Sequence, residues 1–157
     1  MDSMYLYGTS KVNEQGHLEI GGIDTIKLAE KYGTPLYIYD VNLIRERARG
    51  FKQTFDRLGV PSQVAYASKA FSSIAMIQLV EEEGLSLDVV SSGELFTALS
   101  AGFPPERIHF HGNNKTDDEI ALAFDKGVGH FITDNAEDLR AVDNEAKKRG
   151  IKQRVIM

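Results

Sequence analysis

Cysteine is absent from the 157 residues of this sequence. Without it the chain has no disulfide framework, no thiolate metal site and no cysteine nucleophile. The sequence also lacks an apolar run long enough to span a membrane, and no basic, apolar leader opens it. A formal net charge of −5 argues against a nucleic-acid partner. Together these absences predict a cytoplasmic protein with neither a membrane nor a nucleic-acid partner.

The rest of the composition is that of a folded domain, with 42% hydrophobic and 26% charged residues. From residue 42 onward, segments with helical spacing of apolar residues alternate with short apolar runs. This alternation predicts βα units and a parallel sheet. The predicted helices cover residues 42–57, 73–83, 93–101, 117–126 and 135–149, and the predicted strands cover residues 63–68, 85–90, 107–111, 129–133 and 152–157.

Two α/β architectures fit this order, a doubly wound open sheet and a (β/α)₈ barrel. No Gly-x-Gly-x-x-Gly or Gly-x-x-x-x-Gly-Lys motif follows a predicted strand, which weakens the nucleotide-binding doubly wound alternative. The chain ends at Met157 inside an apolar run that is typical of a strand. Because an unpaired apolar edge invites association, we expect the chain to be a fragment or this edge to be covered.

The N-terminal quarter of the chain follows a different pattern. Residues 1–22 are polar and marked by glycine, and they predict an arm with a short hairpin around residues 13–16. A helix is predicted over residues 25–31. Leu36–Tyr39 is then predicted to be a strand, and Asp40 is predicted to be the N-cap of the helix that follows.

Lys69 directly follows the predicted strand 63–68. A charged side chain at the end of an apolar strand is poorly placed for a core, and ligands bind at the carboxyl ends of parallel strands. Partial desolvation there favours the neutral amine, which is a nucleophile toward carbonyl groups and can form a Schiff base. The alternative is a lysine that simply leaves the strand for solvent. Position alone leaves both interpretations open.

Asp88 lies within an otherwise apolar strand, where an unpaired carboxylate would be costly. We therefore expect it to have a partner, and Lys69 on the neighbouring strand is the natural candidate. Glu94 has a structural explanation, because Ser91 and Glu94 have capping-box spacing. Further polar residues at predicted helix starts are interpreted as caps in the same way: Thr116 with Glu119, Asp134 and Asn135.

The segment His111–Lys115 is dense in hydrogen-bond donors and acceptors at the end of another predicted strand. Gly112 within it allows a backbone to approach a ligand closely. His109 and His111 have strand spacing on one face, as a pair of metal ligands would. No carboxylate or third histidine lies in register with them, so we predict no metal site.

Four segments together resemble the N-terminal portion of the diaminopimelate decarboxylase family. The segment around Lys69 is shared more loosely with ornithine and arginine decarboxylases and more distantly with alanine racemase. The segment that begins at His111 points to the diaminopimelate branch. The resemblance extends over essentially the whole chain and rests on Gly33–Asp40, Tyr66–Ala70, Leu87–Leu95 and His109–Lys115.

This resemblance implies an α/β fold, a partial (β/α)₈ TIM barrel of the alanine racemase-like type that binds pyridoxal 5′-phosphate, truncated after about five barrel strands. Residues 1–40 would form an arm and a strand associated with a separate β-domain. Residues 41–157 would form the first part of the barrel. The resemblance also implies a homodimer whose sites form between its two subunits.

The same resemblance implies roles for four residues. Lys69 would be catalytic and would bind pyridoxal phosphate as a Schiff base, and Asp88 would be the second catalytic residue. Glu94 and His111 would contact the cofactor with Lys69. The implied reaction is the decarboxylation of meso-2,6-diaminopimelate to L-lysine and CO₂. In the family the phosphate-binding segments, the acid paired with the pyridine nitrogen and most substrate ligands come later, so we expect this chain alone to be inactive.

Two other functions stay open at this point. A non-catalytic, single-domain pyridoxal-phosphate-binding protein has a similar barrel, although it lacks the N-terminal arm and strand that are predicted here. A structural fragment that binds no cofactor would share the fold without the chemistry.

Overall fold

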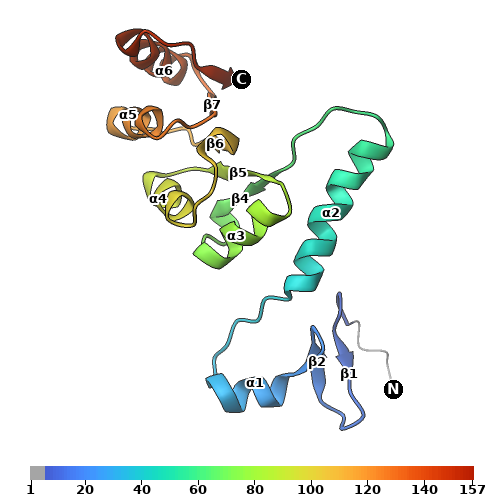
Figure 1. Ribbon diagram of the computed structural model, residues 1–157. Helices are drawn as coiled ribbons and strands as arrows, with labels where there is room; N and C mark the ends of the chain where they lie inside the picture. The colour runs from blue at the N-terminus through green and yellow to red at the C-terminus, as the bar shows by residue number, and fades with distance from the viewer. Residues whose placement is uncertain (1–5) are drawn as a thin grey trace. The chain divides into compact units, whose positions relative to one another are not determined.

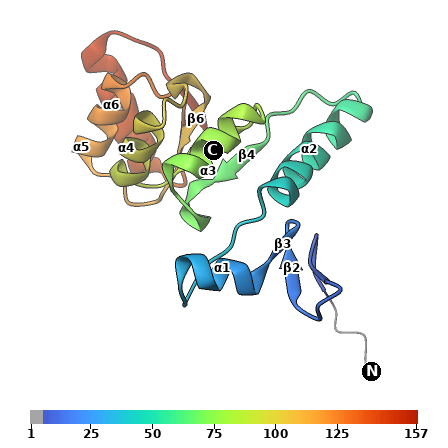
Figure 2. The same ribbon diagram turned by 60° about the horizontal axis from the view of Figure 1, so that its bottom comes forward.

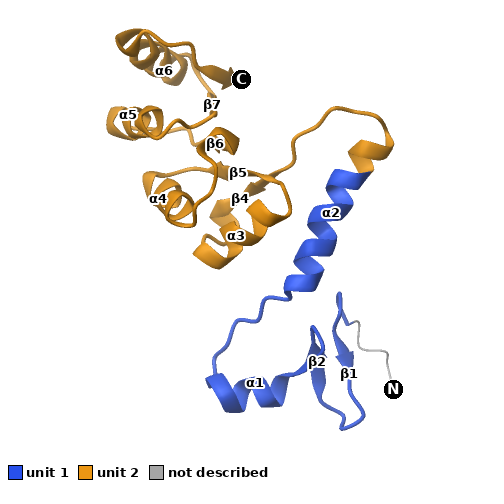
Figure 3. Ribbon diagram, viewed as in Figure 1, with its two compact units in different colours: residues 1–53 blue, residues 54–157 orange. Residues whose placement is uncertain are grey.

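A computed structural model describes residues 6–157 of the chain (Figure 1). These residues form two compact units, one extending to residue 53 and the other covering residues 54–157 (Figure 3). The first five residues of the predicted N-terminal arm lie outside the described residues. None of the helices within residues 6–157 combines the length and the apolar character that crossing a membrane requires.

The first unit contains a small antiparallel sheet of three strands in the order β1-β2-β3. The hairpin predicted around residues 13–16 is confirmed, because a turn closed by the Gly16 N–H and the Asn13 carbonyl joins β1 to β2 at 3.0 Å. The elements of this unit are β1 (Lys11–Val12), β2 (Leu18–Ile20), β3 (Ile23–Asp24), α1 (Thr25–Tyr32) and the greater part of α2 (Val41–Arg57).

Acidic residues begin both helices of this unit. Asp24 accepts a hydrogen bond from the Ile26 N–H and caps α1. Its contact with the His17 ring lowers the pKa of Asp24 to about 2. Asp40 accepts from the Leu43 N–H at 3.1 Å, which confirms it as the N-cap of α2.

The strand predicted over Leu36–Tyr39 is wrong for this structure, because neither sheet of residues 6–157 includes the segment. Its aromatic and β-branched composition favours a strand, but a strand forms only where a neighbouring strand supplies ladder hydrogen bonds. Whether residues 1–40 join a separate β-domain, with the barrel beginning at residue 41, stays a prediction.

The second unit is built from four βα repeats and a fifth strand in one parallel sheet, and all five strands lie within their predicted ranges. Two short 3₁₀ turns, Ser68–Ala70 and Pro105–Arg107, accompany the sheet. The strands are β4 (Ala65–Ala67), β5 (Ser86–Val89), β6 (Ile108–Phe110), β7 (His130–Ile132) and β8 (Arg154–Ile156). The helices are α3 (Ile74–Glu82), α4 (Ser92–Ser100), α5 (Asp117–Asp125) and α6 (Ala136–Arg149).

The order of the strands decides between the two predicted architectures. The sheet runs β4-β5-β6-β7-β8, in chain order without a reversal. In Figures 1 and 2 the helices α3 to α6 follow one another along the same side of this sheet. A doubly wound sheet reverses its order at a switch point and carries helices on both faces. The second unit is therefore a sector of a (β/α)₈ barrel.

The two faces of the parallel sheet differ in chemistry. The face toward the helices is apolar, and its side chains on the three central strands, β5 to β7, are almost fully buried. On this face Phe131 of β7 stacks on Phe124 of α5, with ring centroids 5.1 Å apart. The opposite face carries a row of paired positions that is largely polar. That row is Ala67, Asp88, His109, His130 and Arg154.

The burial of Phe131 yields a stability prediction. Its side chain is 0% exposed, so Phe131→Ala should leave a cavity and lower the free energy of unfolding by about 3–5 kcal/mol. Urea unfolding followed by circular dichroism measures this change. Phe96→Ala is the matched control, because 72% of Phe96 is exposed and its loss should change the free energy little. Equal losses of free energy in the two variants would show that Phe131 is not packed in the core.

Candidate active site

Lys69 lies in the 3₁₀ turn Ser68–Ala70 at the carboxyl end of β4. Its side chain is exposed, and within residues 6–157 its amine has no hydrogen bond or ion pair. Lys69 thus lies at the carboxyl edge of the parallel sheet, as predicted from the sequence. It leaves the amine available for a bond to a ligand.

The ion pair expected between Lys69 and Asp88 does not form in the described chain. Ala67 pairs with Asp88 across the β4–β5 ladder, and an extended chain would place residue 69 on the same face. The 3₁₀ turn that begins at Ser68 interrupts this alternation and directs Lys69 elsewhere. Asp88 Oδ1 is instead buried without a hydrogen-bond partner among residues 6–157.

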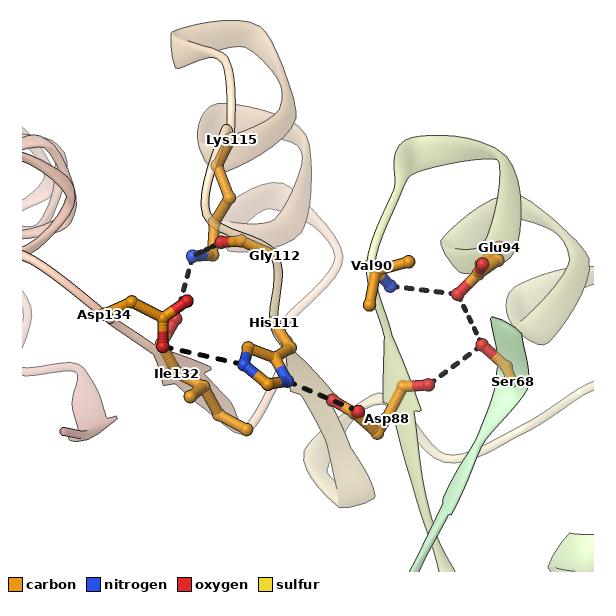
Figure 4. A network of polar contacts seen from close by, with 9 residues as sticks. All are labelled: Ser68, Asp88, Val90, Glu94, His111, Gly112, Lys115, Ile132 and Asp134. Atoms are coloured by element: carbon orange, nitrogen blue, oxygen red, sulfur yellow. Dashed lines mark hydrogen bonds and ion pairs between the residues drawn. The ribbon is translucent and has the colours of Figure 1, made fainter. Parts of the chain in front are cut away.

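Glu94 supports the turn that carries Lys69. The capping box expected from its spacing is only half formed: the Ser91 hydroxyl accepts from the Glu94 N–H, but the carboxylate does not return to Ser91. Glu94 Oε2 accepts from the Val90 N–H at 2.9 Å and lies 2.5 Å from the Ser68 hydroxyl. The same hydroxyl is 2.9 Å from the Asp88 carbonyl (Figure 4). Glu94 therefore joins the start of α4 to the residue before Lys69.

His111 lies between two carboxylates at the ends of different strands (Figure 4). Its Nδ1 is 3.5 Å from Asp88 Oδ2, and its Nε2 is 3.7 Å from Asp134 Oδ1. Both contacts are long for hydrogen bonds, so they place the ring without holding it tightly. The interpretation of Asp134 as a helix cap is wrong, because Asn135 is the N-cap of α6.

Gly112 follows His111 and has a φ of 99°, which favours glycine. A Cβ at this position would lie 3.2 Å from the Val90 carbonyl oxygen. The close approach that the sequence predicted for a ligand is thus made by the neighbouring strand end. A larger residue would push the loop after β6 away from β5.

Sequence reasoning missed a buried ion pair beside His111. Lys115 Nζ is 2.7 Å from Asp138 Oδ2, and the two side chains are 1% and 6% exposed. The sequence signal was present but ambiguous, because Asp138 stands three residues after the cap Asn135 and invites interpretation as a capping-box acid. Its carboxylate instead forms an ion pair with Lys115, which precedes α5.

Glu119 forms the predicted capping box with Thr116 and also accepts from the Ser92 N–H at 3.0 Å. Burial acts to raise the pKa of Glu119, but the hydrogen bonds from Ser92 and Thr116 outweigh it and the pKa is lowered. The carboxylate therefore stays ionised and connects the starts of α4 and α5. Within residues 6–157, no group of three or more histidine, aspartate, glutamate or cysteine side chains is arranged to hold a metal ion.

Comparison with known proteins bears directly on this edge of the sheet. The family described as "Pyridoxal-dependent decarboxylase, pyridoxal binding domain" matches residues 41–157. The chain belongs to this family. Its pyridoxal-binding domain includes the turn with Lys69, the strand with Asp88 and the loop with His111. The resemblance inferred from the sequence and the predicted barrel type are thereby confirmed, and pyridoxal phosphate is the cofactor of the family.

Individual relatives point to one branch of the pyridoxal-dependent decarboxylases. The chain is 63% identical over 154 residues to diaminopimelate decarboxylase of Bacillus methanolicus, covering 98% of this chain and 36% of that protein. It is 62% identical over 147 residues to the enzyme of the same name from Bacillus subtilis strain 168, covering 94% of this chain and 34% of the relative. The chain thus spans about a third of the length of these relatives.

Solved structures agree with these relatives. The diaminopimelate decarboxylase of M. jannaschii, in complex with L-lysine, superposes with a TM-score of 0.80 and 34% sequence identity. The superposition covers 94% of this chain and 35% of that one.

The residues at this edge fit pyridoxal phosphate. An aldehyde cofactor needs an accessible amine without a partner, and the Lys69 amine is exposed and unpaired within the described chain. A bound cationic or N–H group needs an acceptor, and Asp88 Oδ1 is buried with none of its bonding capacity used by residues 6–157. Both observations suit a family that binds this cofactor.

The bonds to Glu94 predict a local loss of stability. Glu94→Leu should leave the Val90 N–H without an acceptor and remove one of the two acceptors near the buried Ser68 hydroxyl, which should lower the free energy of unfolding by about 1–3 kcal/mol. Glu137→Leu, at an exposed position in the first turn of α6, is the control and should cost less. The same urea titration measures both variants, and an equal cost would argue that Glu94 acts only as a charge at a helix start.

His109 predicts a pH dependence of stability. Burial, and then the neighbouring His130, lower the pKa of His109, while Asp88 acts in the opposite direction. The unfolded chain therefore binds a proton at a higher pH than the folded chain, so the contribution of His109 is complete above about pH 6.5 and declines as the pH falls through the lowered pKa. His109→Gln should lose less unfolding free energy than the unmodified chain between pH 7.5 and pH 5.5. Identical losses would contradict this role.

Proposed function

We propose that this chain supplies the first part of the cofactor-binding barrel of a decarboxylase that converts meso-2,6-diaminopimelate to L-lysine and CO₂. The observation that carries the proposal is the exposed amine of Lys69, unpaired within residues 6–157, in a chain of the pyridoxal-dependent decarboxylase family. The relatives named diaminopimelate decarboxylase, and the lysine complex of one of them, support this substrate class.

Lys69 is the residue that bonds the aldehyde carbon of pyridoxal phosphate in this proposal. When bound, the cofactor supplies an electron sink for the pair of electrons left as the carboxyl group departs. The chain's own contribution is to present the lysine amine at the carboxyl edge of the sheet. We expect the chain alone to be inactive, since it spans only about a third of its curated relatives.

Ser68 and Glu94 position this lysine. Their 2.5 Å contact, with the bond from the Val90 N–H to the same carboxylate, holds the 3₁₀ turn against the start of α4. Glu94 was expected to contact the cofactor directly. Its carboxylate is turned toward Ser68 and Val90, so we propose that it acts through the turn that carries Lys69.

Asp88 and His111 are the proposed contacts to the bound molecule. Asp88 Oδ1 is buried and has no partner among the described residues, so it can accept a hydrogen bond from an ammonium or N–H group. The imidazole of His111 stands at the same edge between Asp88 and Asp134. We propose that Asp88 orients the reacting group and that His111 contacts the cofactor or the substrate.

The organisation of the complete protein is part of the proposal. Residues 1–40 would associate with a β-domain, and residues 41–157 would begin the barrel. We also propose a cytoplasmic homodimer that binds a small amino-acid substrate and neither nucleic acid nor a membrane. The net charge of −5 and the resemblance to the family support these points.

A chimera tests the function without requiring the chain to act alone. Residues 1–157 replace the matching third of the Bacillus methanolicus relative, and formation of lysine from meso-diaminopimelate is measured. The chimera should form lysine and show an absorption band near ~420 nm with pyridoxal phosphate. Lys69→Ala should abolish both, by at least about a thousandfold in rate, because no other residue replaces the lost bond.

Lys126→Ala is the matched control, because Lys126 is also exposed but lies at the end of α5. It should retain the band and the rate. Reduction with borohydride followed by peptide mapping should place the pyridoxyl group on Lys69. Lysine formation by Lys69→Ala would refute the assignment. A chimera with the band and no decarboxylation would favour a non-catalytic carrier, and one with neither would favour a structural role.

A further inference from the structure

Lys115 is the most deeply buried charged side chain at the edge of the sheet that carries Lys69 and His111. Its ammonium donates to the Gly112 carbonyl at 2.6 Å and to the Ile132 carbonyl at 2.8 Å (Figure 4). It also donates to Asp138 Oδ2 at 2.7 Å. A lysine has three N–H protons, and here each has an acceptor. The side chain thus has no bonding capacity left for a ligand.

The three acceptors belong to three different segments. Gly112 is the residue after His111 in the loop that follows β6. Ile132 is the last residue of β7, two positions before Asp134. Asp138 is in the first turn of α6. One side chain therefore ties the backbone beside His111 to the segment that carries Asp134.

The energetics of this arrangement favour a role in geometry. Replacing a buried ion pair by apolar side chains is often neutral or stabilising, so the pair by itself is a weak source of stability. Two of the three acceptors are carbonyl groups, which no apolar side chain could bind. What Lys115 contributes and a hydrophobic residue could not is a fixed spacing between two strand ends.

We propose that Lys115 is a positioning residue that sets the spacing between His111 and Asp134 and so orients the imidazole at the Lys69 edge of the sheet. The consequence for ligand binding rests on the proposed function. The three bonds of Lys115 to Gly112, Ile132 and Asp138, called the clamp below, belong to this chain and can be tested without any cofactor.

A double-mutant cycle in the chimera tests the proposal. Lys115→Met, His111→Ala and the double variant are compared by their dissociation constants for pyridoxal phosphate and their kcat/KM for lysine formation. Each single change should raise the dissociation constant or lower kcat/KM by about tenfold. In both quantities the double variant should match the more impaired of the two single variants, because Lys115 acts through His111.

Lys147→Met is the matched control, since Lys147 also pairs with an aspartate, Asp143, but is 72% exposed on α6. It should leave both quantities unchanged. Effects of Lys115→Met and His111→Ala that multiply in the double variant would overturn the proposal. A His111→Ala variant with unchanged affinity and kcat/KM would overturn it as well.

A second comparison separates positioning from simple stability. Lys115→Met leaves Asp138 buried without its partner and should lower the thermal midpoint. Adding Asp138→Leu removes the unpaired charge and should restore much of the midpoint. Binding and kcat/KM should stay low, because the bonds to Gly112 and Ile132 are still missing. Recovery of function together with stability would show that Lys115 is merely structural.

Amide hydrogen exchange of the chain itself provides the test that needs no cofactor. Lys115→Met should speed exchange in residues 111–115 and 132–135 and leave the amides of β5 unchanged. Uniform acceleration, or none, would overturn the clamp. If the unmodified chimera neither binds pyridoxal phosphate nor forms lysine, the proposed function fails and exchange alone decides the clamp. If the chimera is active and the effects of Lys115→Met and His111→Ala are independent, only the clamp is overturned and the proposed function stands.

Discussion

An acidic side chain at the start of each of three helices connects the repeats of the second unit at the edge of the sheet that carries the candidate site. At the third position of α4, α5 and α6, where a carboxylate commonly returns to the backbone of its own cap, each acid bonds to the preceding βα unit. The pairs are Glu94 with Ser68, Glu119 with the Ser92 N–H, and Asp138 with Lys115. These bonds hold the turn of Lys69 and the loop of His111 against neighbouring helices, so the geometry of the candidate site depends on them.

The parallel sheet makes that edge possible by separating two kinds of surface. The face under the helices is apolar and closely packed, as the stacking of Phe131 on Phe124 shows. The other face carries Asp88 and two histidines, and several of its buried polar atoms lack partners among residues 6–157. Polar groups kept on one face of a firmly packed sheet are held in place without sacrificing the core, which is what a binding site requires.

Much of the fold could be predicted because it follows from local periodicity. Helical and strand spacing located all five strands of the second unit, and cap chemistry identified Asp40, Ser91 and Asn135. Composition was misleading at Leu36–Tyr39, where it favours a strand but neither sheet of the described chain offers a partner. Local reasoning also located Lys69 at a strand end, although the residue-by-residue roles there came from resemblance to a family.

The sequence by itself determined which residues stand at strand ends, because that depends on spacing along the chain. It did not determine which of them meet. Lys69 was paired with Asp88 in the prediction, but a 3₁₀ turn separates them and Asp88 faces His111 instead. Lys115 and Asp138, 23 residues apart, were joined only by the register of neighbouring βα units. Contacts between repeats are long-range, so only the tertiary structure decided them.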